Sequence, residues 1–142
     1  MNSVLKIVFH GDNAANFRPG LEELLHSPHQ IVSVSQGMAQ ADERAHFETA
    51  DVVVGIALNA DMPRPQKMRL LQAPSAGTDG IQRHCLPTTA QLANCFGHEN
   101  AIAEYVIAAL LMRHVPLARA DQDLRQQRWT YWAGRPTALR RD

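Results

Sequence analysis

A run of small residues, Gln-Ala-Pro-Ser-Ala-Gly-Thr-Asp-Gly at positions 72–80, carries the chemistry that the sequence suggests first. The run follows an expected strand and precedes a possible helical turn, and Gly77 lets a ligand come close to the neighbouring backbone N–H groups. N–H groups at a strand end that leads into a helix bind anions such as a carboxylate. Small-residue turns are also common without any ligand, so a purely structural turn stays the alternative.

Histidine and cysteine also occur near each other, at His84, Cys85, Cys95 and His98. These are the ligand types of tetrahedral zinc sites. However, adjacent residues such as His84 and Cys85 rarely chelate one ion together, and the chain has no C-x-x-C pair. We therefore expect no metal site, and two free thiols that are small buried apolar residues in a reducing compartment.

Three common catalytic or nucleotide-binding motifs are missing from the sequence. The eight glycines form neither G-x-G-x-x-G nor G-x-x-x-x-G-K-[ST], the fingerprints of dinucleotide and nucleotide binding. Ser75 lies between Pro74 and Ala76, so there is no G-x-S-x-G nucleophile elbow either. The sequence argues against serine hydrolase chemistry and contains no phosphate-binding loop of its own.

Apolar runs that position the small-residue loop predict strands near residues 4–9, 31–34, 51–56, 68–72 and 89–94. Asn16 can cap a helix that has Pro19 in its first turn and ends at Ser27-Pro28, and residues 39–49 resemble a second helix. Runs that are apolar on both faces belong in the middle of a covered sheet. The alternation therefore predicts an α/β fold with a parallel sheet flanked by helices.

A long helix is expected over residues 100–113, and it is apolar nearly all round, which indicates cover on more than one side. The chain then becomes charged up to Arg128 and reaches three aromatic residues, Trp129, Tyr131 and Trp132. Such aromatic patches often mark a partner surface. Folding back onto the core is the alternative.

The composition is that of an ordinary soluble domain, with 142 residues, 14 Lys and Arg against 14 Asp and Glu, and 45% hydrophobic residues. No apolar stretch is long enough to span a membrane, and the N-terminus lacks a signal peptide pattern, so we expect a cytoplasmic protein. Residues 113–142 are basic, but no nucleic-acid motif accompanies them, and a solvated helix face explains them better.

The order of the motifs adds a resemblance to a known family. Leu70-Leu71-Gln72, Ser75-Ala76-Gly77-Thr78-Asp79-Gly80-Ile81, Leu86-Pro87, Asn94, the segment from Gly97 to Val106, and Trp129 follow one another. This succession resembles the N-terminal half of the D-isomer-specific 2-hydroxyacid dehydrogenases, in particular the glyoxylate/hydroxypyruvate reductase type. The likeness covers about Leu70 to Trp129, and before it only the strand and helix order matches.

The resemblance implies a flavodoxin-like substrate domain over residues 1–98, followed by a long interface helix and a dimerisation or hinge arm over 99–142. It implies that Gly77 and Thr78 offer N–H groups to a substrate carboxylate, and that Ala76 and Ile102 touch the nicotinamide cofactor. The family's catalytic Arg, Glu and His lie in or after an NAD-binding Rossmann domain that this chain lacks, so no catalytic residue is assigned. Thr78 and His98 depart from the family's usual residues at their positions.

The leading hypothesis is therefore a substrate-domain fragment of an NAD(P)-dependent oxidoreductase that acts on D-2-hydroxy acids or 2-oxo acids. The fragment is expected to be inactive alone, to bind no NAD or NADP by itself, and to form a homodimer through residues 99–142. A stand-alone flavodoxin-like binding or assembly module is the alternative. A phospho-receiver domain is disfavoured because Asp12 and Asp51 alone do not make its acidic cluster.

Overall fold

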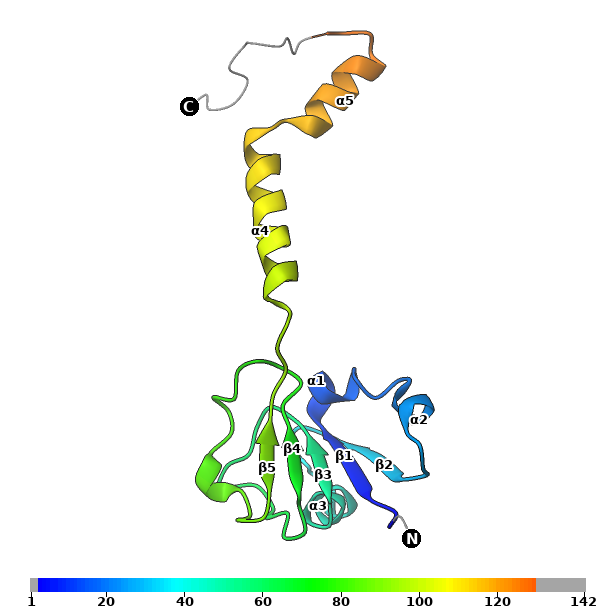
Figure 1. Ribbon diagram of the computed structural model, residues 1–142, viewed down its shortest axis with the longest axis vertical. Helices are drawn as coiled ribbons and strands as arrows, with labels where there is room; N and C mark the ends of the chain where they lie inside the picture. The colour runs from blue at the N-terminus through cyan, green and yellow to red at the C-terminus, as the bar shows by residue number, and fades with distance from the viewer. Residues whose placement is uncertain (1–2, 130–142) are drawn as a thin grey trace. The chain divides into compact units, whose positions relative to one another are not determined.

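The computed structural model describes residues 3–129, and the chain divides into two units, Met1–Phe96 and Gly97–Asp142. Within the described part, the first unit holds a parallel sheet with the strand order β2-β1-β3-β4-β5 (Figure 1). This is the doubly wound order of flavodoxin-like folds. The predicted α/β fold with a parallel sheet is confirmed. The strands are β1 (Lys6–His10), β2 (Gln30–Val34), β3 (Val52–Val54), β4 (Leu70–Gln72) and β5 (Gln91–Ala93).

The strand register explains why the strand sequences are apolar on both faces. Val8, Val53, Leu71 and Leu92 are aligned across four strands, and the first three are fully buried. Because side chains alternate along a strand, the preceding residue of each strand points to the opposite face. That second row is Ile7, Val52, Leu70 and Gln91.

The helices of the first unit are shorter than the sequence predicts in one place. The helix expected between Asn16 and Ser27 is only the single turn α2 (Leu21–Leu24), and a further short helix, α1 (Gly11–Ala15), comes before Asn16. Gly20 separates them with a left-handed φ of 81°, which a helix interior does not tolerate. The second expected helix is α3 (Ala41–Glu48), and a reciprocal capping box between Gln40 and Glu43 fixes its start.

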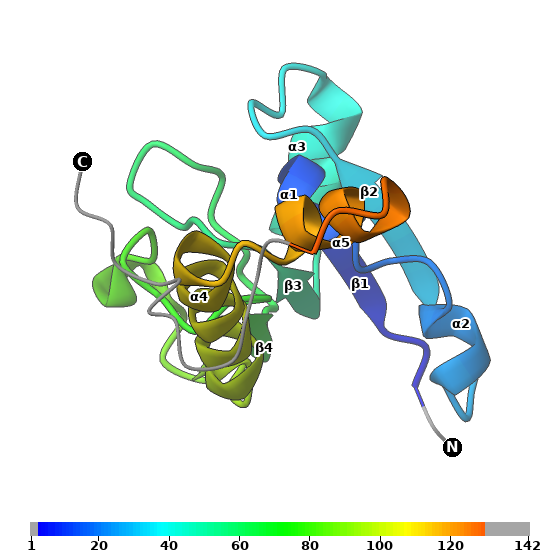
Figure 2. The same cartoon turned by 90° about the horizontal axis from the view of Figure 1, so that it is seen from above.

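Two apolar clusters hold the helices to the sheet. On one face, Phe47 of α3 joins Val8, Val53 and Leu71 in the larger cluster. On the other face, Ala14 of α1 joins Ile7 and Phe9, with Leu21 of α2 packed beside them. Helix α3 therefore lies on one face of the sheet and α1 and α2 lie on the other, and Figure 2 gives the view from above. A short 3-10 turn, η1 (Arg83–Cys85), lies between β4 and β5.

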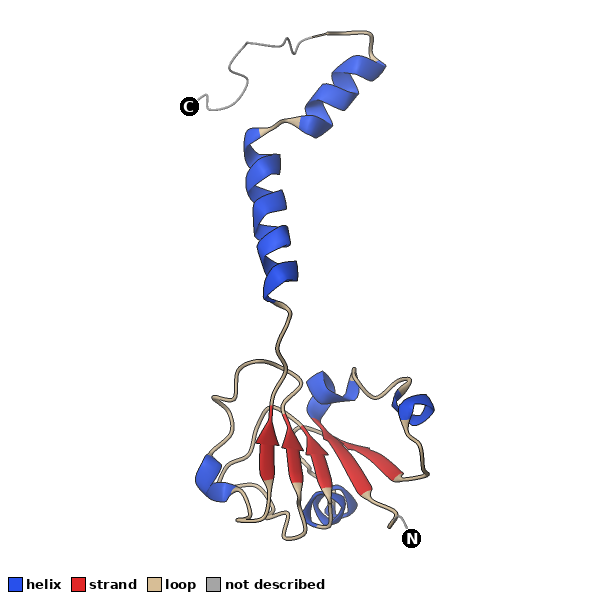
Figure 3. Cartoon of the chain, in the orientation of Figure 1, coloured by secondary structure: helices blue, strands red, loops and turns tan. Residues whose placement is uncertain are grey.

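The second unit consists of two helices in its described part, α4 (Glu99–His114) and α5 (Leu117–Arg125) (Figure 3). No residue of α4 is buried, although most of the helix is apolar. In α5 the carboxylate of Asp123 is largely buried and accepts a 2.7 Å hydrogen bond from Arg128. Trp129 is 60% exposed, and the aromatic residues Tyr131 and Trp132 lie outside the described residues.

None of the helices in residues 3–129 is by itself long and apolar enough to cross a membrane. The pair α4 and α5, which bends by 52° at its break, passes that test together by length and composition only.

Candidate functional site

The candidate site lies at the carboxyl edge of the sheet, where parallel sheets of this kind bind their ligands. Phe9, Val54, Gln72 and Ala93 are aligned in the last complete row of strand partners. The pairing extends one step further, because the Ala73 N–H donates to the Ala93 carbonyl at 2.8 Å. The small-residue loop thus starts from a fixed position at the end of β4.

Hydrogen bonds to the loop's carbonyl groups hold its shape. The Asn94 side-chain amide donates to the Ala76 carbonyl at 2.8 Å, and the Cys95 N–H donates to the Ser75 carbonyl at 3.0 Å. Inside the loop, the Ser75 hydroxyl donates to the Gly77 carbonyl at 2.9 Å. Three successive carbonyl groups are therefore satisfied by protein donors.

The backbone N–H groups of the same segment differ from its carbonyl groups, because they have no protein partner in the described residues. Within residues 3–129, the backbone N–H groups of Ala76, Gly77 and Thr78 donate no hydrogen bond to the protein. Gly77 is exposed, and its two neighbours are half-buried. A loop whose carbonyl groups are occupied and whose N–H groups are free presents positive dipole ends, which suits an anion.

The need for glycine lies at Gly80 rather than at Gly77. A side-chain Cβ at Gly80 would overlap the Ile56 carbonyl oxygen, whereas at Gly77 it would meet only the Asp79 carboxylate at 3.3 Å. The Leu58 N–H donates to the Gly80 carbonyl at 3.0 Å, which ties the end of the loop to the segment after β3. The sequence does not predict this contact, because no local pattern pairs Gly80 with Ile56.

His10, at the carboxyl end of β1, is a buried polar residue that the sequence analysis also missed. Its imidazole is 1% exposed, lies edge-on to Phe47 with 5.4 Å between ring centroids, and has Nε2 3.1 Å from the Gln36 carbonyl. Nδ1 has no hydrogen-bond partner in the described part of the chain. Burial lowers the pKa of His10, against a smaller raising effect of the Gln36 carbonyl. Its place at the end of an apolar run, just before Gly11, is the signal that could have identified it.

The structure brings three of the four predicted site residues together. Ala76, Gly77 and Thr78 are consecutive in the loop of the first unit, whereas Ile102 belongs to α4 of the second unit and is 55% exposed. A single glycine, Gly11, follows β1, so the residues present do not fit the pyrophosphate of a whole dinucleotide.

The cysteine prediction is half wrong. Both thiols are free as expected, but Cys95 is exposed and Cys85 is only partly buried. The reason is that Cys95 follows the end of β5, where its Sγ lies 3.6 Å from the Ala73 carbonyl at the edge of the fold rather than in a core. Among the residues described, no three His, Cys, Asp or Glu side chains come together as a metal site would require.

Comparison with known proteins adds a likeness in fold. No family model matches the chain, and no curated protein matches it in sequence. A solved chain described as the pyruvate reductase of Chlamydomonas reinhardtii superposes with a TM-score of 0.57 at 15% identity. The match covers 96% of this chain and 42% of that one, so this chain spans less than half the length of the enzyme. At this identity, the likeness establishes a shared fold.

Proposed function

We propose that the chain is the substrate-binding portion of an NAD(P)-dependent oxidoreductase that acts on small 2-hydroxy and 2-oxo acids. The single observation that carries this proposal is the set of free N–H groups at Ala76, Gly77 and Thr78, at the carboxyl edge of a doubly wound sheet. The fold shared with part of a pyruvate reductase supports it.

The loop binds and orients the acid. The N–H groups of Gly77 and Thr78 donate to the substrate carboxylate, and the hydrogen bonds to the loop's carbonyl groups keep those donors in place. Donors that are already oriented do not have to be ordered when the ligand binds, which favours affinity and fixes the position of the 2-oxo carbon. This chain contributes no acid, base or hydride to the reaction.

The cofactor is NAD or NADP, which supplies the hydride when it is bound in the longer parent protein. Ala76 and Ile102 are the residues of this chain that contact its nicotinamide. Because the chain has no dinucleotide fingerprint, it binds neither cofactor on its own. Purified chain supplied with glyoxylate or hydroxypyruvate and NADPH therefore oxidises no cofactor above the rate in buffer. Measurable oxidation would contradict this assignment.

An NMR titration of the isotopically labelled chain with glyoxylate tests the carboxylate site directly. The amide signals of Gly77 and Thr78 shift and saturate, with an affinity of about 1 mM or weaker, because a few hydrogen bonds are all that hold the ligand. Thr78→Pro removes one N–H donor and abolishes the shifts, whereas the matched Thr78→Ala retains that donor and the shifts. Equal behaviour of the two variants would overturn the proposal.

We also propose that the chain forms a homodimer through α4 and the segment that follows it. Most of α4 is apolar, and within its unit none of its residues is buried. An apolar surface of this extent marks a protein interface in a folded protein.

A further inference from the structure

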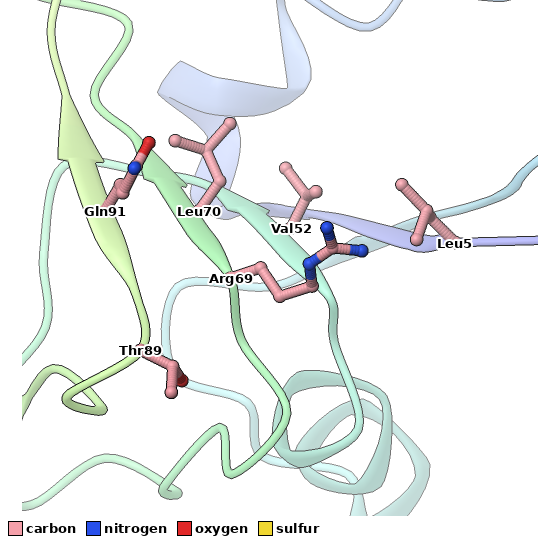
Figure 4. Close-up of a pocket in the computed structure, with 6 residues that line it drawn as sticks. All are labelled: Leu5, Val52, Arg69, Leu70, Thr89 and Gln91. Atoms are coloured by element: carbon pink, nitrogen blue, oxygen red, sulfur yellow. The ribbon is translucent and has the colours of Figure 1, made fainter. Parts of the chain in front are cut away.

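Within the first unit, one face of the sheet is only partly covered over β3 and β4, where the α1 cluster reaches Val52 and Val54 but leaves them half-buried. Val52, Val54 and Leu70 lie on this face and are only half-buried, whereas Val53 and Leu71 on the other face are fully buried. We call these three residues the open sheet face. A pocket of about 360 Å³ lies on it (Figure 4). Parallel sheets are covered on both faces almost without exception, so this face has the character of a docking surface. The pocket is lined by Leu5, Val52, Arg69, Leu70, Thr89 and Gln91.

Among the six described residues that line this pocket, Arg69 is the one cation. The exposed side chain of Arg69 extends towards Val52 and Leu5 (Figure 4). Throughout residues 3–129, no carboxylate pairs with its guanidinium and no acceptor receives a hydrogen bond from it. An apolar floor with an unpaired cation at its edge complements an apolar segment that carries one carboxylate.

Helix α4 has that chemistry. Glu104 is the acidic residue in its middle, and its carboxylate has no ion pair in the described part of the chain. Ile107 and Leu111 follow at spacings of three and four residues, so the three side chains share one side of the helix. Both apolar side chains are 56% exposed.

The opposite side of α4 indicates that the occupant comes from a second copy. Ile102, Tyr105 and Val106 lie there, and they are 55%, 76% and 47% exposed. A sheet covers only one side of a helix. In a two-fold dimer, α4 of each copy would pack on the sheet of the other copy. The remaining apolar sides of the two helices would then pack against each other.

From these observations we infer that α4 of one copy packs on the open sheet face of a second copy, with Glu104 paired to Arg69 across the interface. The inference rests on the proposed homodimer and names the surface on which its helix docks. A closed dimer contains the contact twice, once in each direction.

Charge reversal tests the contact. In Arg69→Glu the two contacts become Glu–Glu, and in Glu104→Arg they become Arg–Arg, so each variant dimerises at least about tenfold more weakly than the original chain. An equimolar mixture of the two variants restores the dimer, because a mixed pair has an acid opposite a base in both contacts. Light scattering on a size-exclusion column measures the masses, and circular dichroism verifies that each variant is folded.

The mixing experiment separates the possible outcomes. If the original chain is a monomer, both the homodimer and this contact are wrong. A dimer that neither substitution weakens beyond the control Arg83→Glu, which changes an exposed charge on η1, retains the homodimer and overturns the contact. Variants that are weakened but not restored by mixing also overturn the pairing, because an intrachain contact or a folding defect would behave in that way.

Discussion

The two units of this chain use apolar residues in opposite ways. In the sheet unit, the large side chains of Phe9, Phe47 and Leu71 are at most 2% exposed and pack into clusters on both faces of the sheet. In the helical unit, Tyr105 and Met112 are more than 70% exposed, and α4 has no buried residue. The difference shows that apolar composition predicts that a side chain is buried, but not whether the same chain or a second molecule buries it. The sheet unit is stabilised by its own core, whereas the homodimer that we propose is what covers the helical unit.

Matched leucine truncations give the largest expected contrast. Leu71→Ala removes a fully buried side chain and lowers the free energy of unfolding by about 2–5 kcal/mol at any protein concentration. Leu111→Ala truncates a side chain that is 56% exposed, so its effect is small in dilute protein and grows as the dimer forms. Urea unfolding at two protein concentrations measures both, and equal, concentration-independent losses would abolish the distinction.

Two glycine substitutions in the sheet unit test whether the close contact at Gly80 anchors the end of the loop. Gly80→Ala places a methyl group against the Ile56 carbonyl and costs about 1–3 kcal/mol of stability. Gly37→Ala enters open space and stabilises the protein by about 0.4–1 kcal/mol through the unfolded chain. The two unfolding midpoints in urea should move in opposite directions. A neutral Gly80→Ala would show that the loop's end is not held by this contact.

The pH dependence of stability is expected to follow His10. Burial lowers its pKa in the folded protein, so the unfolded chain takes up the proton at a higher pH. Its contribution to stability is therefore complete above the ordinary pKa of about 6.5 and is lost as the pH falls below it towards the folded pKa. His10→Leu should flatten this part of the curve of unfolding free energy against pH, whereas the exposed His84→Leu should leave it. An unchanged slope in His10→Leu would assign the effect to another group.

Two arginine pairs of the helical unit give the smallest expected effects. Arg125 and Asp121 form an exposed pair one helical turn apart, at 2.9 Å, and removing it costs at most about 0.5 kcal/mol. Arg128 holds the more buried Asp123, so Arg128→Ala should lower the helical signal in circular dichroism more than Arg125→Ala does. The reverse order would mean that burial of Asp123 contributes nothing to α5.

The sequence predicted the parallel sheet because β1, β2 and β3 are rich in Val and Ile and because the apolar runs alternate with helix-like segments. It predicted the ends of these elements less well. The strand expected over 51–56 is only Val52–Val54, although the Gly55 N–H still donates to the Gln72 carbonyl, and from Ile56 the chain continues into the segment that contacts Gly80. The helix expected from Asn16 starts only at Leu21, because Gly20 before it has a left-handed φ of 81°.

The candidate site was predictable in part. The small-residue run at positions 76–78 identified the loop, because accessible backbone is a property of the residues themselves. The hydrogen bonds from Asn94 and Cys95 that occupy its carbonyl groups come from a different strand, and no spacing along the chain reveals them. His10 and Arg69 were not predicted for the same reason. Among the described residues, His10 is notable because it is buried with Nδ1 unpartnered, and Arg69 because its guanidinium forms no ion pair. Neither property follows from the local sequence.

Amide hydrogen exchange of the whole chain at low and high protein concentration tests the central claim most directly. We predict that the amides of Val8, Val53 and Leu71 are protected equally at both concentrations, and that those of α4 gain protection only when the chain is concentrated enough to pair. Strong protection of α4 in a dilute monomer would contradict the claim, because it would show that the helical unit is stabilised without a second copy.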